Sequence, residues 1–402
     1  ANTVTTGSFT IPLMKRTGYS GEFAAGVEAC SSTMGQIMPP IMGAAAFIMA
    51  EFLAIPYYKV CIAALIPAFL AFAATFLQVH FRATALGLAG IPRSELPTLR
   101  AALAKGWHHM FSILLLVYFL MRNFSPERAV FWAIAATVIS SLIMCLVRKQ
   151  SVKEFGFSIL AGLKEGALGT AEVAAACAAA GIIIGSITMS GLGIRFSSLV
   201  VDASMGYLAL ALPFTMLACI FLGMGVPTTA QYVIISSLVA PALSQMGVVP
   251  IAAHLFVLYF GTRADITPPV ALAAYAGSGV AGSDPMKTGV RAFQLGIAGF
   301  IIPFMFVYAP ELLLIGHPVK IALACLTAFL GIYCLAAGVQ ACMLVPSKWY
   351  ETGILLIVAL LMIKPGVITD SIGIPLFIGV LTIQILRKRH QGSPLQAAQG
   401  SL

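Results

Sequence analysis

The strongest candidates for chemistry are an arginine and an aspartate inside a long apolar stretch. Arg263 and Asp265 lie in the segment Gly261–Pro269, which interrupts an apolar run over about residues 250–280. A guanidinium can receive the carboxylate of an anionic ligand. An ionisable group at bilayer depth costs about 3 kcal/mol on insertion scales, so it marks a functional hypothesis. The alternative is that Arg263 and Asp265 neutralise one another or face a loop.

A second acid, Glu28, stands before another interruption. The apolar run over residues 18–52 is expected to break at Ser31–Gln36, ahead of Pro39-Pro40. Glu28 lies one helical turn before this break. It could bind a proton or a cation, or it could be a buried acid held by hydrogen bonds.

Hydroxyl and amide side chains gather at the same interruptions. Unwound backbone leaves carbonyl groups free for cations and amide groups free for anions, and neighbouring hydroxyls suit either task. Serine and threonine also serve as packing residues in membrane helices, and that reading stays open for each of them. The candidate substrate contacts are Arg263, Asp265, Ser31, Thr267 and Gln36.

The composition requires a membrane protein to hold these residues. Sixty per cent of the residues are apolar and 9% are charged, whereas a soluble protein has about 25% charged residues. Many apolar runs approach the roughly 20 residues that a helix needs to cross a bilayer. The predicted fold class is an all-α polytopic membrane protein. Besides the interrupted segments, spans are predicted near residues 58–80, 107–121, 128–147, 168–190, 288–312, 319–342, 351–364 and 370–386.

Several other function classes are disfavoured. The net charge of +9 comes from short basic clusters beside apolar runs, as in cytoplasmic loops, so no nucleic-acid partner is expected. The eight cysteines lie in apolar segments without CxxC spacing and are read as small buried hydrophobes. The sequence contains no GxxxxGK[ST] phosphate-binding loop, so it encodes no ATP motor, and no enzyme constellation is found.

The chain contains an internal repeat. Shifted by 229 residues without a gap, the sequence places Gly18 on Gly247 and Thr33 on Thr262. The same register places Pro39-Pro40 on Pro268-Pro269, so both interrupted segments carry a proline pair. A common register for all of these residues indicates duplication.

Two short apolar arms flank the Gly/Pro-rich segment Gly223–Thr229, over about residues 205–245. We predict a re-entrant hairpin, which enters and leaves the membrane on one side. Residues 2–14 are the expected returning arm of a matching hairpin, so the natural protein is expected to continue upstream of Ala1. With Arg387-Lys388-Arg389 in the cytoplasm, most basic clusters fall inside and the two copies have opposite orientation. Inverted repeats of this kind are typical of secondary transporters.

Five parts are expected. They are a first transport part (1–80), basic connectors and scaffold spans (81–204), a second transport part (205–312), additional C-terminal spans (313–390) and a polar tail (391–402).

At these residues the chain resembles the large membrane subunit of the TRAP transporters, and in particular the fused permeases that work with TAXI-type binding proteins. The resemblance is carried by Gly21–Glu51, by Gly223–Tyr232 (GMGVPTTAQY) and by Tyr259–Ala274 (YFGTRADITPPVALAA), and it covers nearly the whole chain. The family's cation sites lie at hairpin tips and helix breaks. The resemblance therefore implies cation contacts at Ser32, Thr33, Gly225, Pro227, Thr228, Gly261 and Thr262, to which the residue pattern adds Glu28.

The resemblance implies an elevator mechanism, in which a mobile domain of hairpins and broken helices slides against a scaffold. It implies no cofactor other than a coupling ion, Na⁺ or H⁺. It also implies that a periplasmic TAXI-type binding protein delivers a small organic acid, and that the permease lies in the bacterial cytoplasmic membrane. A binding-protein-independent divalent-anion or citrate symporter, an intramembrane enzyme and a passive channel remain as alternatives.

Overall fold

The computed structural model describes residues 2–92, 98–122, 124–363 and 366–390, and these residues contain helices but no β-strand. Six helical stretches among them are long and apolar enough to cross a membrane. They are α4 (Tyr57–Leu86), α6 (Pro126–Val147), α7 (Val152–Met189), the pair α13 (Pro285–Leu295) and α14 (Ala298–Tyr308), α15 (Pro318–Val339) and α17 (Val367–His390). The predicted all-α polytopic membrane class is confirmed.

The two copies of the sequence repeat have matching helices. Adding 229 to the bounds of α1 (Asn2–Arg16), α2 (Gly21–Met34) and α3 (Ala44–Phe52) gives 231–245, 250–263 and 273–281. The corresponding helices are α10 (Thr228–Gln245), α11 (Pro250–Ala264) and α12 (Leu272–Ala281). Helix α4 corresponds in the same way to α13, α14 and the short helix η2 (Pro310–Leu313).

Each broken helix ends where its proline pair withdraws hydrogen-bond donors. A proline leaves the carbonyl four residues earlier without its helical partner. For Pro39 and Pro40 these are the carbonyls of Gly35 and Gln36, where α2 has given way to the 3-10 turn η1 (Gly35–Ile37). In the second copy Pro268 and Pro269 affect the carbonyls of residues 264 and 265, and α11 ends at residue 264. Both Pro-Pro bonds are cis.

The predicted position of the first break was wrong by four residues. Ser31–Met34 are helical, and the irregular backbone extends from Gly35 to Gly43. Gly261–Ala264, expected within the second break, are likewise the last turn of α11. The reason is that a proline pair affects carbonyls up to four residues upstream and no further.

Four other segments differ from the prediction. Helices α5 (Leu99–Met121) and α7 begin upstream of the spans predicted near residues 107–121 and 168–190. Helix α8 (Leu192–Ala203) follows Gly191, which has φ +68°, and was not predicted. Helix α16 (Trp349–Leu361) has 13 residues and is about 20 Å long, shorter than the roughly 30 Å hydrocarbon core.

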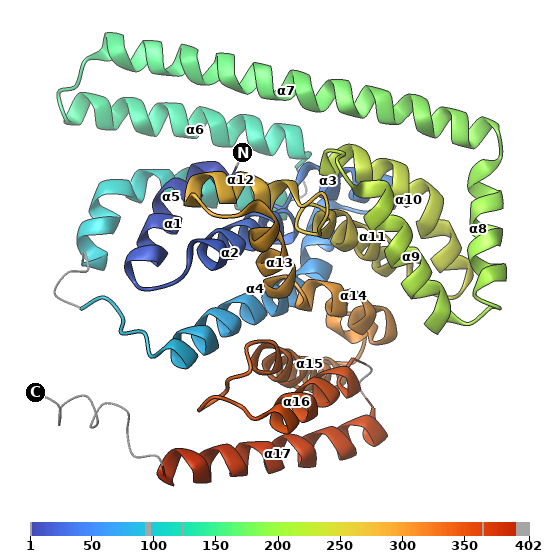
Figure 1. Cartoon of the computed structure of the whole chain (residues 1–402). Helices are drawn as coiled ribbons and strands as arrows, with labels where there is room; N and C mark the ends of the chain where they lie inside the picture. The colour runs from blue at the N-terminus through green and yellow to red at the C-terminus, as the bar shows by residue number, and fades with distance from the viewer. Residues whose placement is uncertain (1, 93–97, 123, 364–365, 391–402) are drawn as a thin grey trace, which may run out of the picture.

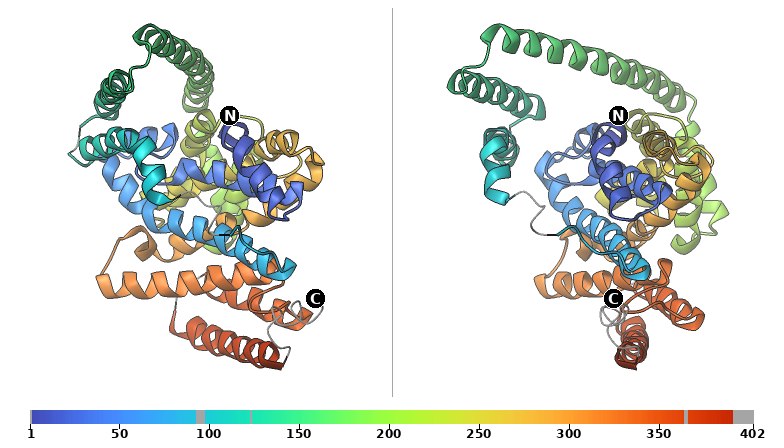
Figure 2. Two further views of the ribbon diagram at one scale, coloured as in Figure 1. Left: turned by 90° about the vertical axis from the view of Figure 1, so that its left-hand side faces the viewer. Right: turned by 60° about the vertical axis from the view of Figure 1, so that its left-hand side comes forward.

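The repeats occupy the middle of the molecule (Figure 1). Helices α6 and α7 run along one side, and α15–α17 form a separate layer on the opposite side. Figure 2 shows the same order of layers from two further directions. Helix α10 packs against α9 (Leu208–Gly223), as the predicted hairpin requires, and also against α7 and α8. The arms of this hairpin have 16 and 18 residues, about 24 and 27 Å of helix, which is short for a span.

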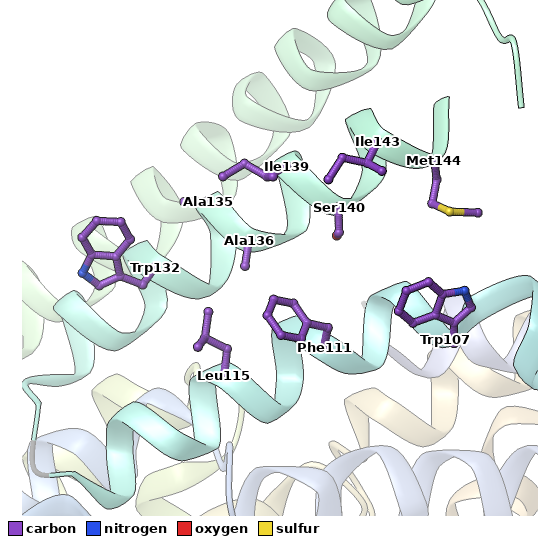
Figure 3. Close-up of a pocket in the computed structure, with 10 residues that line it drawn as sticks. All are labelled: Trp107, Phe111, Leu115, Trp132, Ala135, Ala136, Ile139, Ser140, Ile143 and Met144. Atoms are coloured by element: carbon purple, nitrogen blue, oxygen red, sulfur yellow. The ribbon is translucent and has the colours of Figure 1, made fainter. Parts of the chain in front are cut away.

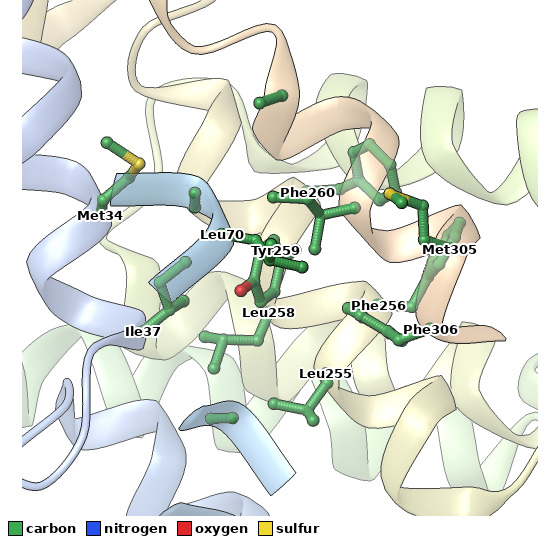
Figure 4. Packing of buried hydrophobic residues seen from close by; sticks show 14 of the residues in the cluster. Met34, Ile37, Leu70, Leu255, Phe256, Leu258, Tyr259, Phe260, Met305 and Phe306 are labelled. Carbon is green, nitrogen blue, oxygen red and sulfur yellow. The ribbon is translucent and has the colours of Figure 1, made fainter. Parts of the chain in front are cut away.

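Helix α11 is the centre of the core. Phe256, Tyr259 and Phe260 are at most 1% exposed, and α11 packs against α2, η1, α4, α9, α10 and α14. Figure 4 shows Tyr259 between Met34 and Ile37 of the first copy and the side chains of α14. The two broken helices, distant in sequence, therefore pack directly against each other.

The C-terminal layer is fastened by one buried ion pair. Glu351, fully buried at the start of α16, pairs with Arg387 near the end of α17 at 2.8 Å. Gln384 and the backbone amide of Lys348 also donate to Glu351, at 2.5 and 3.0 Å. These contacts place the first turn of α16 and the last turns of α17 on the same side of the molecule.

This network predicts a stability effect. Arg387→Ala would leave the Glu351 carboxylate buried without its cation, which costs about 3 kcal/mol for a buried pair. We expect a lower melting temperature for the detergent-solubilised protein. Lys388→Ala, at the exposed neighbouring position, is the control and should melt as the wild type does. Equal melting of both variants would contradict this role of the pair.

Candidate functional site

Arg263 is a buried cation without an acidic partner in the described part of the chain. Its side chain is 0% exposed, and among the described residues Nε, Nη1 and Nη2 find no oxygen acceptor. The side chain lies against Gly299 of α14, where a Cβ would come within 3.0 Å of the Arg263 Cδ, Nε and Cζ atoms. Cys30 and Tyr259 are close enough to interact with it electrostatically, and the Tyr259 hydroxyl is also buried without a hydrogen bond. Within the described residues, the guanidinium in the last turn of α11 therefore has no carboxylate or carbonyl acceptor, and only the Cys30 thiol interacts with it as a hydrogen-bond partner.

Asp265 does not neutralise this arginine. The two side chains form no ion pair in the described part of the chain. Asp265 is only partly buried, and it interacts with the hydroxyl of Thr228 in the first turn of α10. The carboxylate thus faces the hairpin tip, where Gly225 and Pro227 are exposed, while the guanidinium faces the interior.

A carboxamide links each hairpin arm to its broken helix. Gln231 of α10 is 1% exposed, and neither of its amide atoms has a hydrogen bond to any residue that the structure describes. It lies between Gly223 and Gly261: a Cβ at Gly223 would overlap its amide, and one at Gly261 would lie 3.1 Å from its Nε2. At the matching positions of the first copy, Asn2 Nδ2 donates to Ser32 Oγ at 3.0 Å. The 229-residue shift relates Asn2 to Gln231 and Ser32 to Gly261.

The predicted threonines mostly bond to their own helices. Thr33 donates to the carbonyls of Ala29 and Cys30, at 3.1 and 2.9 Å. Thr262 donates to Tyr259 O at 2.8 Å, and Thr267 to Arg263 O at 2.7 Å. Thr33 and Thr262 are buried inside helices, and only Thr267 lies in a break.

Ser31 and Gln36 lie at or near the first break and are partly buried. The Gln36 carbonyl accepts a bond from Gly43 N at 2.8 Å across the break. Gln36 occupies the position that Asp265 has in the second copy, so each break carries a polar side chain at the same place.

Glu28 belongs to α2, and its side chain lies against α1 and is 8% exposed. Its Oε1 accepts from Thr6 and, at 3.1 Å, from Ser32, and its Oε2 accepts from Thr10 at 2.5 Å. The sequence prediction included Glu28 and Ser32, but it missed Thr10 and Asn2. The signal was present, because Asn2, Thr6 and Thr10 are four residues apart and share one face of α1.

The structure thus places six of the predicted residues in two groups. One surrounds Glu28 and Ser32, and the other comprises Arg263, Asp265, Gly261 and Thr228. Gln231, which the prediction also missed, contacts Gly261 and extends the second group toward the hairpin. Both groups lie on the broken helices and the hairpin arms that cover them.

Basic residues gather on one side, near the start of α2. Lys15 donates to Ala281 O at 2.8 Å, and Arg82 lies over the Phe23 ring at 6.0 Å. Lys287 and Arg291 line a pocket with Glu22. These contacts bring four basic residues, from α1, α4 and α13, together around the start of α2.

An apolar cavity between α5 and α6 is a poor site for an anion. It measures about 440 Å³ and is lined by Trp107, Phe111, Trp132 and other apolar residues, with Ser140 as the polar exception. Figure 3 shows these side chains facing one another across the gap between the two helices. A carboxylate there would be buried without a charge partner, which is strongly unfavourable.

Comparison with known proteins gives two matches. Residues 1–321 match a family model described as "Tripartite ATP-independent periplasmic transporter, DctM component". Residues 321–392 match a domain of unknown function, DUF3394. The second match begins in the first turn of α15, so it corresponds to the layer α15–α17. No curated protein matches the chain.

The packing of Arg263 predicts the effect of a single methyl group. Gly299→Ala places a Cβ against a buried side chain that has little room to shift, and overpacking of this kind costs about 1–3 kcal/mol. We expect a lower melting temperature in detergent. Gly279→Ala on α12, where a Cβ meets nothing within 4 Å, is the control. If the two variants melt alike, Arg263 does not pack against Gly299 as described.

Proposed function

This chain belongs to the DctM component family of the tripartite ATP-independent periplasmic transporters, and from that premise we propose that it drives uptake of small carboxylates with an ion gradient. The family makes it a permease for organic acids and a multi-pass membrane protein, with a periplasmic substrate-binding protein as its partner. Our proposal adds a TAXI-type binding protein, the bacterial cytoplasmic membrane and an elevator mechanism.

The observation that carries the substrate proposal is the unpaired guanidinium of Arg263. A cation buried at membrane depth without a counter-charge is costly, and a substrate carboxylate would remove that cost. A guanidinium can hold a carboxylate through two parallel hydrogen bonds. Ser31, Gln36, Asp265 and Thr267, on or beside the two breaks, are the proposed neighbouring contacts.

Access to Arg263 requires movement. The side chain is 0% exposed and is closed off by α14 at Gly299 and by Tyr259. We propose that a substrate reaches it only after α11 and α14 separate locally. The two hairpin arms and the broken helices would move as one transport part, because they pack mainly on one another.

The proposed ion contacts lie at the same breaks and at the tip of the α9–α10 hairpin. Thr228, Gly225 and Pro227 lie at that tip, and Gly261 and Thr262 in the last turn of α11. Ser32, Thr33 and Glu28 lie on α2. Hydroxyl, carbonyl and carboxylate oxygens suit Na⁺, and a carboxylate also suits H⁺.

The central test is uptake by Arg263→Ala. The substitution should remove the hydrogen bonds between the Arg263 guanidinium and the substrate carboxylate. Such a contact contributes about 1.5–3 kcal/mol, so we expect uptake to fall at least tenfold. The measurement is accumulation of radiolabelled mono- and dicarboxylates by proteoliposomes that contain the full-length permease, with its binding protein added. Arg195→Ala, at an exposed position on α8, is the control. Normal uptake by Arg263→Ala would remove this residue from the substrate site.

The coupling prediction concerns the same liposomes. An inward gradient of sodium or of protons, imposed separately, should drive the labelled acid above its external concentration. An ionophore that collapses the effective gradient should abolish accumulation. If neither gradient produces accumulation, the permease is not ion-coupled.

A further inference from the structure

Glu28 stands in a hydroxyl cage that the second copy of the repeat lacks. Its carboxylate accepts from Thr6, Thr10 and Ser32. The 229-residue shift places Ile235, Val239, Val257 and Gly261 at the positions of Thr6, Thr10, Glu28 and Ser32. Because apolar residues fill the same space in the second copy, the fold does not need an acid here.

Two of the cage hydroxyls have a second acceptor in reach. Thr6 Oγ1 lies 2.9 Å from the carbonyl of Asn2, and Thr10 Oγ1 lies 3.1 Å from the carbonyl of Thr6. A hydroxyl carries one hydrogen, so each donates either to the carboxylate or to its own helix. Both arrangements use the same heavy-atom positions.

These alternatives allow Glu28 to be charged or neutral without repacking. When the carboxylate is ionised, the hydroxyls donate to it. When a proton binds one carboxyl oxygen, that O–H donates to a hydroxyl oxygen, and the hydroxyl hydrogen turns to the backbone carbonyl. Every polar atom keeps a partner in both states, which avoids the cost of a buried unsatisfied group.

No fixed cation holds Glu28 in the charged form. In the described part of the chain, Glu28 forms no ion pair or hydrogen bond with the other titratable or charged side chains of α2 or of the helices packed against α2. They are Lys15 and Arg16 on α1, Tyr57, Tyr58, Lys59, Cys61, His80 and Arg82 on α4, His254, Tyr259 and Arg263 on α11, Tyr275 on α12, Lys287 and Arg291 on α13, and Glu22 and Cys30 on α2 itself.

We propose that Glu28, with Thr6, Thr10 and Ser32, binds and releases the proton that drives uptake. This inference rests on the proposed function and deepens it, since it selects H⁺ at this site. The three side-chain oxygens that bond to the carboxylate belong to hydroxyl groups, which can donate to the ionised carboxylate and accept from the protonated carboxyl. A sodium ion would instead need those oxygens to present lone pairs to one common point.

The test is infrared difference spectroscopy of the full-length protein in lipid nanodiscs, between about pH 8 and about pH 5. We expect the C=O stretching band of a protonated carboxyl to appear on acidification. All proteins compared carry Asp265→Asn, which removes the partly buried carboxyl at the second break. In that background the band should be absent in Glu28→Gln and retained in Glu51→Gln, which changes an exposed acid on α3. Replacing sodium with choline should not alter it.

Thr10→Val gives a second variant that preserves the shape of the site. It removes one donor to the ionised carboxylate, so the midpoint of the band should move to higher pH by about one unit. A band that persists in Glu28→Gln, or one that sodium suppresses, overturns the proposal. So does an unchanged midpoint in Thr10→Val.

Uptake separates this inference from the function on which it rests. If a proton gradient drives accumulation in the wild type but not in Glu28→Gln, both stand. If sodium alone drives uptake and the band is missing, the proton site fails and the transport function stands. If the band titrates as expected but no gradient drives uptake, the transport function fails.

Discussion

The bilayer requires every backbone polar group inside it to be satisfied by the protein, and this constraint shapes the whole molecule. The two proline pairs leave carbonyls without helical donors at the breaks that follow α2 and α11. Such backbone can exist at membrane depth only where other protein surrounds it. The fold meets this requirement by packing α2 and η1 against α11 and by laying α1 and α10 over them. The same arrangement encloses the irregular backbone of both breaks in protein.

The two copies share their backbone but not their chemistry. Both have the broken helix, the carboxamide that reaches from the hairpin arm, and a polar residue in the break, Gln36 or Asp265. The guanidinium occurs only in the second copy and the caged carboxylate only in the first. Met34 replaces Arg263, and Val257 replaces Glu28. Duplication supplied the scaffold, and divergence at a few positions supplied one basic and one acidic site.

The C-terminal layer is attached to α4 and α13 by two hydrogen bonds in series. Gln340, directly after α15, donates to Gln78 of α4 at 3.1 Å, and Gln78 donates to Leu295 O at 2.8 Å. Gln78 is 0% exposed, and the Phe81 and Tyr333 rings pack beside it with centroids 5.3 Å apart. The layer that matches the domain of unknown function is therefore bound to α4 and to the junction of α13 and α14.

The sequence alone determined the membrane class, the repeat and the presence of a break at each proline pair, because these depend on local properties. Hydrophobic length, the missing donor of proline and a common register of 229 residues need no knowledge of packing. Only the tertiary structure decided that Thr10 meets Glu28, that Gln231 lies between two glycines, and that Arg263 is enclosed without Asp265 as a partner. Those facts depend on which helix faces meet, and a nearly uniform apolar sequence does not specify them.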